Sequence, residues 1–366
     1  MEHRSAISTR QLSILVIMNV TGTSILTIPS ILAMEAKQDA WLAAILALLL
    51  TLPILFLYLA LHKKHPMKNL TEIFEAVLGN WVGKLTSLLF IMIYPVLLSA
   101  LTLRGMGGFV QVQTMPETPI GAIYIIFILV VIYAVKLGIE SISRTAEILV
   151  AISLFMLAFM FITLVPQIHI EHLLPIFEGG FKPVIRGAVP LMSFPFLELV
   201  LFLMIFPHAN EQAKVRKALL SGVFIGWSLL FLITMLAILV LGLEITSSET
   251  YPSYTLAKKI SIGKFFERVE STIAFAWFFT CFIKMCTYFY LIVYGLAQTL
   301  NLKDSKFLII PLGILIVNVA LLVVPNSSYI INFSRTIFPF FNLTFGLAMP
   351  LFLLAATLVR GYARNE

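Results

Sequence analysis

The stretch Asn19-Val20-Thr21-Gly22-Thr23-Ser24 interrupts a long apolar run that extends from residue 11 to residue 34, and Pro29 follows shortly after it. Lipid offers no partner for the backbone groups that an interrupted helix releases, so a polar, glycine-containing patch there needs a reason. In many transporters the reason is a discontinuous helix, whose free N–H groups bind an anionic group while freed carbonyls face a cation. We interpret residues 19–24 as such a site. The alternative is a kinked helix whose hydroxyls bond back to the previous turn.

The composition indicates a membrane protein. Hydrophobic residues make up 60% of the 366 and charged residues only 12%, which excludes a water-soluble globule with a polar surface. Apolar runs of about 20 residues, the length that crosses the hydrocarbon layer, occur at 11–34, 41–61, 83–110, 119–138, 145–165, 185–207, 218–242, 268–297, 307–324 and 333–358. We therefore predict an all-α membrane protein with about ten transmembrane helices, forming one transmembrane domain over residues 1–366.

The positive charges predict the orientation of the chain in the bilayer. If the N-terminus is cytoplasmic, the loops on the cytoplasmic side carry about twice as many Lys and Arg as the outer loops. We therefore expect both termini in the cytoplasm. The formal charge of +7 is explained by this asymmetry and gives no case for nucleic acid.

A second interruption lies in the sixth apolar run. Pro190 and Ser193-Phe194-Pro195-Phe196 fall inside it, and Pro195 cannot donate the helical hydrogen bond. Glu198 places a carboxylate near the expected midplane, where ionisable residues are usually functional or paired. The two interrupted runs begin two five-helix groups, approximately residues 8–165 and 183–360, and an odd number of helices gives the second group the opposite topology. The pattern predicts an inverted 5+5 repeat with discontinuous helices 1 and 6.

Three basic residues lie within or at the ends of the expected spans. Lys284 is expected close to mid-depth in the eighth span, Arg104 toward the outer end of the third, and Arg335 near the outer surface of the last. An arginine exposed to lipid is costly unless it reaches the interface. Arg104 and Arg335 are therefore candidate outer-gate residues, and a snorkelling anchor is the alternative for Arg104.

The two breaks and Lys284 are expected to converge on one ligand site. The N–H groups of the first break would receive the carboxylate of a small amino acid, Glu198 or nearby carbonyls would receive its ammonium, and two phenylalanines would shape the pocket. The candidate ligand-binding residues are Thr21, Gly22, Thr23, Ser24, Phe194, Phe196 and Glu198. Lys284 would place an ammonium against carbonyls of the first break, where a related transporter would hold sodium. The alternative is a plain Glu198–Lys284 ion pair that steadies the core.

No enzyme signature stands out in the sequence. It contains no His-Glu-x-x-His, no phosphate-binding glycine loop and no nucleophile elbow. The pairs His62/His65 and His169/His172 lack a convincing set of metal-ligand partners, so we interpret them as solvated histidines. We expect no catalytic residue, cofactor or metal.

A set of short motifs is spread over nearly the whole length of the chain: Ile7-Ser8, Gln11-Leu12, Gly22-Thr23, Ile28-Pro29, Ala36, Asp39-Ala40-Trp41, Leu174-Pro175, Gly180, Lys182-Pro183, Gly187, Pro195-Phe196, Glu198 and Pro207. With these motifs the chain resembles a known family, the B subunit of bacterial spore nutrient-germinant receptors. That family is similar to the amino acid–polyamine–organocation transporters.

The resemblance implies a germinant-sensing subunit in the spore inner membrane that works with an A and a C subunit. It also implies that the subunit recognises a small nutrient, typically an amino acid, and helps to start cation release. One departure concerns the first break, because the wider superfamily commonly has Gly-x-Gly where this chain has Gly22-Thr23-Ser24. The alternatives are a proton-coupled or uncoupled amino-acid transporter, with Glu198 or Lys284 titrating, and a scaffold that binds nothing.

Overall fold

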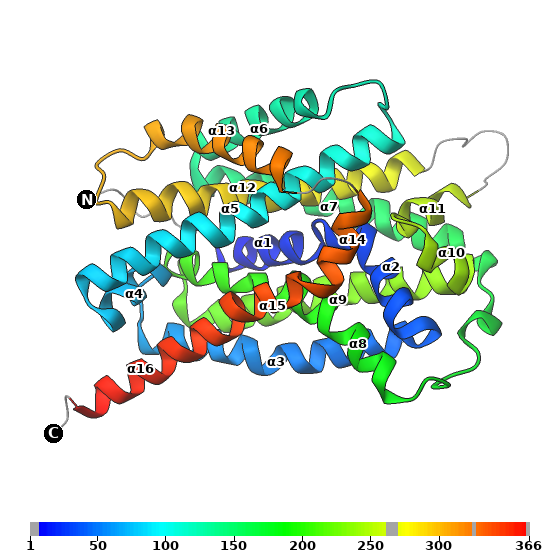
Figure 1. Ribbon diagram of the computed structural model, residues 1–366, viewed down its shortest axis with the longest axis horizontal. Helices are drawn as coiled ribbons and strands as arrows, with labels where there is room; N and C mark the ends of the chain where they lie inside the picture. The colour runs from blue at the N-terminus through cyan, green and yellow to red at the C-terminus, as the bar shows by residue number, and fades with distance from the viewer. Residues whose placement is uncertain (1–6, 261–269, 324–326, 364–366) are drawn as a thin grey trace.

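The computed structural model describes residues 7–260, 270–323 and 327–363 as a bundle of helices (Figure 1). The α-helices are α1 (Thr9–Thr21), α2 (Ser24–Ala36), α3 (Ala40–Lys64), α4 (Leu70–Leu78), α5 (Asn80–Gln113), α6 (Ile120–Lys136), α7 (Gly138–Leu164), α8 (Phe181–Leu191), α9 (Val215–Leu236), α10 (Gly242–Ser248), α11 (Pro252–Lys258), α12 (Glu270–Thr299), α13 (Lys306–Leu322), α14 (Ser327–Thr336), α15 (Phe338–Leu343) and α16 (Met349–Ala363). Short 3₁₀ or π segments between them are η1 (Lys37–Asp39), η2 (Val165–Gln167), η3 (Ile170–Leu173), η4 (Met192–Phe196), η5 (Leu197–Met204), η6 (Phe206–His208), η7 (Gln212–Lys214), η8 (Ala237–Leu241) and η10 (Thr344–Ala348).

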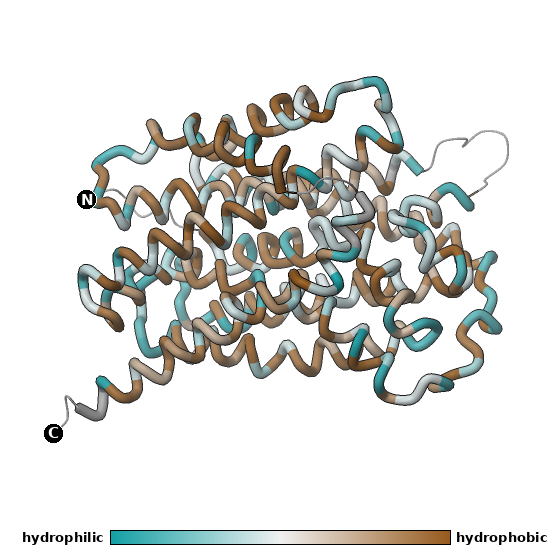
Figure 2. Tube along the Cα trace, in the orientation of Figure 1, coloured by the Kyte–Doolittle hydropathy of each residue, from teal (hydrophilic) through white to brown (hydrophobic). Residues whose placement is uncertain are grey.

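The helices have the length and apolarity of an integral, multi-pass membrane protein. Within the described ranges, seven helical stretches are long and apolar enough to cross a membrane: Ser24–Lys64, Asn80–Gln113, Gly138–Gln167, Phe181–Met204, Gln212–Ser248, Ile273–Thr299 and Phe338–Arg360. The helices α6 and α13 are apolar but shorter. Figure 2 shows apolar residues along the helices and polar ones concentrated at the two ends of the bundle. Large apolar side chains such as Ile126, Phe155 and Phe352 are exposed on the outside, where lipid would cover them.

The first half-helix, α1, lies in the middle of the bundle (Figure 1). Its N-terminus is fixed by a capping box, in which the Gln11 N–H donates to Ser8 Oγ at 3.1 Å and the Ser8 N–H donates to Gln11 Oε1 at 2.9 Å. Two glycines of α9 let that helix approach α1 closely. A Cβ on Gly222 or Gly226 would lie 2.7 Å from a side-chain atom of Val16 or Val20, respectively. Helix α1 is therefore held in the core, not at the periphery.

The predicted first break is present. Helix α1 ends at Thr21, whose hydroxyl donates to Ile17 O at 2.8 Å, and the Gly22 N–H donates to Met18 O at 2.9 Å. Gly22 then leaves the helical conformation, with φ −10° and ψ −117°, and α2 begins at Ser24. The hydroxyl does bond back to the previous turn, as the kinked-helix alternative expects, but the chain also separates into two helices.

The predicted second break is present as well. Helix α8 ends at Leu191, and in the π segment η4 that follows, Phe194 takes the non-helical values φ −122° and ψ 108°. The chain then continues as η5, so the sixth apolar run consists of three unlike helical pieces. Pro195, directly after the departure, has no N–H with which to continue the helix.

Side chains from other helices bind the backbone that the second break releases. The Tyr58 hydroxyl of α3 lies 3.2 Å from Leu197 O, just after the break, and 2.5 Å from Gly346 O of η10 in the last span. The Asn342 amide of α15 donates to Ser193 O at 3.0 Å. These contacts supply the partners that lipid could not give.

Candidate ligand-binding site

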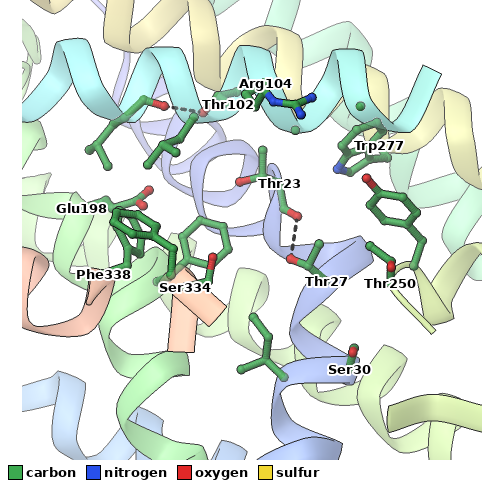
Figure 3. A pocket seen from close by; sticks show the side chains of 18 residues that line it. Thr23, Thr27, Ser30, Thr102, Arg104, Glu198, Thr250, Trp277, Ser334 and Phe338 are labelled. Carbon is green, nitrogen blue, oxygen red and sulfur yellow. Dashed lines mark hydrogen bonds between the residues drawn. The ribbon is translucent and has the colours of Figure 1, made fainter. Parts of the chain in front are cut away.

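A cavity of about 100 Å³ lies beside the two breaks, between α2, α5, α12, the sixth apolar run and the start of the last span. The loop between α10 and α11 contributes Thr250 and Tyr251 to its wall. In Figure 3, Glu198 and Phe338 lie on one side of it and Trp277 and Thr250 on the other, with Thr23 between them. Its polar and aromatic lining includes Thr23, Thr27, Ser30, Thr102, Arg104, Phe194, Glu198, Thr250, Tyr251, Trp277, Ser334 and Phe338.

Some polar atoms beside this cavity have no hydrogen-bond partner within the described protein. Ser30 Oγ and Trp277 Nε1 are both buried and unpaired, and both residues line the cavity. Ser24 Oγ, one residue into α2, is buried and unpaired too. Unpaired buried polar atoms are costly, so such atoms beside a cavity are suited to hydrogen bonding with something that enters it.

Tyr251 adds a neutral polar group to the cavity wall. Burial raises the pKa of its phenol to about 12, and the charge of Arg104 lowers it by less. The phenol therefore stays protonated at physiological pH. It can donate or accept a hydrogen bond there without changing the charge of the cavity.

A buried ion pair lies at the second break. Lys284 Nζ is 2.8 Å from Glu198 Oε2, and only 1% of the lysine side chain and 3% of the glutamate side chain are exposed. The Tyr288 hydroxyl donates to the same oxygen at 2.5 Å. No hydrogen bond to Glu198 Oε1 occurs among the described residues, and Glu198 belongs to the cavity wall. Two donors therefore occupy one carboxylate oxygen while the other is left for a ligand.

Lys284 also contacts the first break. Its ammonium is 3.4 Å from Thr23 Oγ1 and 4.8 Å from the centre of the Phe194 ring, a cation–π distance. Its aliphatic stem passes so close to Gly22 that a Cβ there would lie 2.5 Å from Lys284 Cδ. One side chain of α12 thus touches both interruptions. The ammonium is placed against a hydroxyl and a ring of the breaks, and its ionic partner is Glu198.

The structure brings only some of the predicted ligand-binding residues to the cavity. Thr23, Phe194 and Glu198 line it, and Arg104, proposed for the outer gate, lines it too. Phe196 is fully buried and is not part of the wall.

The other residues of the first break lie behind Thr23. Thr21, Gly22 and Ser24 are buried next to the cavity without lining it. The Gly22 N–H is already bonded to Met18 O, which leaves the amides at the start of α2 as the ones without a helical partner.

Arg335 lies outside the cavity, in an ion pair. Its Nε donates to Glu35 Oε1 at 2.6 Å, which joins α14 to the end of α2. The same arginine lines a second, open groove together with Lys37 and Glu178. Its neighbours Phe333 and Ser334 line the cavity, so the pair lies between the cavity and this groove.

Sequence reasoning missed several residues of the site. Tyr288 follows Lys284 by four residues on one helix, a spacing that puts both side chains on the same face and could have revealed it. Thr27 follows Thr23 in the same way. Tyr251 and Trp277 gave no such signal, because long segments separate them from the breaks in sequence.

The described residues contain no group of three or more His, Cys, Asp and Glu side chains placed to hold a metal ion. His169 contacts Glu171 at 3.1 Å, and His172 Nδ1 lies 3.0 Å from Leu239 O. Cys281 and Cys286 are buried and free.

The fold is shared with a class of membrane transporters. The structure matches a Na⁺-coupled sialic acid symporter in its substrate-bound outward-open state, a LeuT-fold protein, with a TM-score of 0.62 and 12% sequence identity over 93% of this chain and 79% of the symporter. At that identity the likeness concerns the fold alone.

The sequence identifies the family within that class. The family model described as "Spore germination protein" matches residues 6–328. Spore germination protein KB of Bacillus subtilis (strain 168) is 29% identical over 96% of this chain and 94% of its own length, and spore germination protein XB of Bacillus anthracis is 25% identical over 89% and 90%. The chain belongs to the spore germination protein family. It is a non-enzymatic, B-like subunit of the germinant receptors with a transporter-like fold.

Proposed function

We propose that the chain binds a small amino acid, or a similar nutrient, in the cavity between its two broken helices, and that binding starts germination together with partner subunits. The observation that carries the proposal is the position of Glu198. Its carboxylate forms part of the cavity wall, and one of its oxygens has no hydrogen bond among the described residues. That oxygen would receive the ligand's ammonium, and the amides at the start of α2 would receive its carboxylate.

The proposal includes the topology and the location of the subunit. Each of the ten apolar runs coincides with helical segments in the described residues, which supports one domain with ten crossings arranged as an inverted 5+5 repeat. Both termini would lie in the cytoplasm and the subunit in the spore inner membrane, with the A and C receptor subunits as its partners.

Arg104 and Arg335 are proposed to act in the outer gate. Arg104 lines the cavity. Arg335 with Glu35 lies between the cavity and the open groove that Arg335 lines together with Lys37. Opening the contact between α2 and α14 would admit the ligand. Closing it over the ligand would shift the conformational equilibrium that the partners sense.

A transporter is the second candidate function, because the structure matches that of a sodium-coupled symporter. The two functions differ in flux. The purified chain in proteoliposomes would be tested with a panel of radiolabelled amino acids, for binding and for accumulation, with and without a proton gradient. Binding without accumulation supports the receptor. Accumulation well above protein-free liposomes would replace the receptor with the transporter.

The role of Glu198 is tested by a pair of variants in spores. Glu198→Gln leaves Lys284 buried without its counter-ion, a change that costs about 3–5 kcal/mol in comparable cases, so reduced protein and loss of the nutrient response are both expected. Glu198→Gln combined with Lys284→Gln removes both charges.

The double variant separates ligand binding from structural support. We expect it to recover the amount of protein in the membrane, measured by immunoblot, but not the germination response, measured by loss of absorbance. Recovery of both would show that the pair only steadies the core, and would overturn the proposed binding role of Glu198.

A further inference from the structure

The buried pair at the second break neutralises the one carboxylate that the described residues contribute to the cavity wall, to which Arg104 adds a positive charge. Lys284 Nζ and the Tyr288 hydroxyl both contact Oε2 of Glu198, at 2.8 Å and 2.5 Å. The glutamate and the lysine together contribute no net charge. The carboxylate that lines the cavity is therefore already neutralised before any ligand arrives.

The lysine cannot easily withdraw from this position. Its side chain is 1% exposed, its stem is packed over Gly22, and its ammonium has Thr23 Oγ1 at 3.4 Å and the Phe194 ring at 4.8 Å as further neighbours. A ligand ammonium that binds the remaining oxygen of Glu198 must share one carboxylate with this fixed cation. Because the lysine and the glutamate are almost fully buried, such like-charge proximity is strongly unfavourable.

We propose that Lys284 and Tyr288 are the specificity-determining residues of the site. They restrict it to small molecules that bring a carboxylate of their own with their ammonium, and they exclude simple amines. This inference rests on the proposed function and names the class of its ligand. A zwitterion adds no net charge to a site that already holds the Glu198–Lys284 pair and Arg104, whereas an amine of the same size adds one positive charge beside those two cations.

The two residues contribute differently. Lys284 supplies the charge that penalises a second cation. Tyr288 carries no charge and acts through Glu198, as a positioning residue, because its hydroxyl holds Oε2 away from the ligand and so presents Oε1. Loss of the lysine should therefore reverse the charge preference, and loss of the hydroxyl should only weaken it.

The test compares each amino acid with the amine that remains when its carboxylate is removed. The probes are the proteinogenic amino acids and their matched amines, titrated into the purified full-length chain in lipid nanodiscs. The readout is the ratio of the two dissociation constants. For the unchanged chain we expect amines to bind at least about tenfold more weakly than their parent amino acids, since the repulsion between two ammonium groups in such a site exceeds that factor.

The variants test the assignment to single residues. Lys284→Met keeps most of the stem over Gly22 but leaves Glu198 negative, and should make the amine the tighter ligand. Tyr288→Phe should bring the dissociation constants of the amine and of its parent amino acid closer together, while the amino acid stays the tighter ligand. Lys258→Met removes an exposed lysine of α11 outside the cavity and should leave the ratio unchanged.

The outcomes are distinct. Equal binding of amines and amino acids to the unchanged chain, or an unchanged ratio in folded Lys284→Met, would overturn this inference and leave the proposed function standing. Binding of neither class to the unchanged chain would overturn both. If Lys284→Met does not fold, the double variant Lys284→Met with Glu198→Gln removes both charges of the buried pair. We expect this double variant to bind neither amino acids nor amines. Amino-acid binding as tight as in the unchanged chain would refute the inference.

Discussion

At the scale of single residues, the candidate site is organised around the contacts of one lysine side chain. Lys284 joins an ion pair, a hydroxyl of the first break and an aromatic ring of the second. From the sequence we expected Lys284 against carbonyls of the first break, with an ion pair to Glu198 as the alternative; the structure contains that ion pair. The sequence did not predict Tyr288 at the same oxygen. A tyrosine in an apolar helix is ordinarily part of the packing, and only the structure shows where its hydroxyl points.

Position 22 should not tolerate a residue larger than glycine, because the Lys284 side chain packs directly over it. Gly22→Ala would place a Cβ 2.5 Å from Lys284 Cδ, and the lysine is held at both stem and ammonium. Overpacking of this kind costs about 1–3 kcal/mol. We expect a lower melting temperature of the detergent-solubilised protein and a nutrient response weakened by about tenfold or more, which is the equivalent of about 1.4 kcal/mol. Gly121→Ala is the control, since nothing lies within 4 Å of its Cβ position. Equal melting temperatures for the two variants would contradict the close contact.

At the scale of helices, both interruptions follow from residues that the sequence displays. Gly22 and Pro195 lie at points where an apolar run cannot continue as a regular helix, and the structure interrupts the helix at each of them. Other features carried no clear signal. The π segments η8 and η10 arise in runs that read as ordinary apolar helix. Such small adjustments depend on neighbouring helices and not on local sequence.

Tyr58 should stabilise the second break. Its hydroxyl lies within hydrogen-bond distance of Leu197 O and Gly346 O, two buried carbonyls from different spans. Tyr58→Phe leaves both without this partner, at a cost of about 1–3 kcal/mol. We expect a lower melting temperature and a reduced nutrient response. Tyr133→Phe removes a hydroxyl from an exposed tyrosine of α6 and should change neither quantity. A Tyr58→Phe protein as stable as the control would show that the break does not need this hydroxyl.

The pair between Arg335 and Glu35 should govern access to the cavity. Arg335→Gln breaks the contact between α14 and α2, so a cysteine placed at Ser334 in the cavity wall should react faster with a membrane-impermeant thiol reagent. The charge swap Arg335→Glu with Glu35→Arg should return the rate toward its original value. Arg144→Gln disrupts an exposed pair within α7 and serves as the control. An unchanged reaction rate in Arg335→Gln would show that the Arg335–Glu35 pair does not restrict access to the cavity.

At the scale of the whole molecule, different helices form the two polar ends of the bundle. In Figure 1, α4 and the end of α16 lie at one end, and α10 and α11 lie at the other. The composition predicted a multi-pass membrane protein, which is confirmed, and its Lys and Arg distribution predicted which end is cytoplasmic. The cavity could not be predicted in the same way, because its walls come from helices far apart in the chain. For this reason the sequence singled out Thr23 and Glu198, which belong to the two interrupted runs, but not Tyr251 and Trp277, which line the same cavity.

Cysteine labelling tests the orientation. Lys303 is exposed on a loop expected on the cytoplasmic side, and Lys258 is exposed at the end of α11, in a segment expected on the outer side. With an impermeant maleimide and intact cells, Lys258→Cys should be labelled directly and Lys303→Cys only after permeabilisation. The unchanged chain provides the blank, since both native cysteines are buried. The opposite labelling pattern would invert the topology.

The most direct test of the central claim is a structure of the chain in nanodiscs with the tightest-binding amino acid from the binding panel. The account predicts ligand density in the cavity, with the ammonium against Glu198 Oε1 and the carboxylate toward the start of α2. Density only in the open groove beside Arg335 and Lys37, or a cavity that stays empty at saturating ligand, would contradict it.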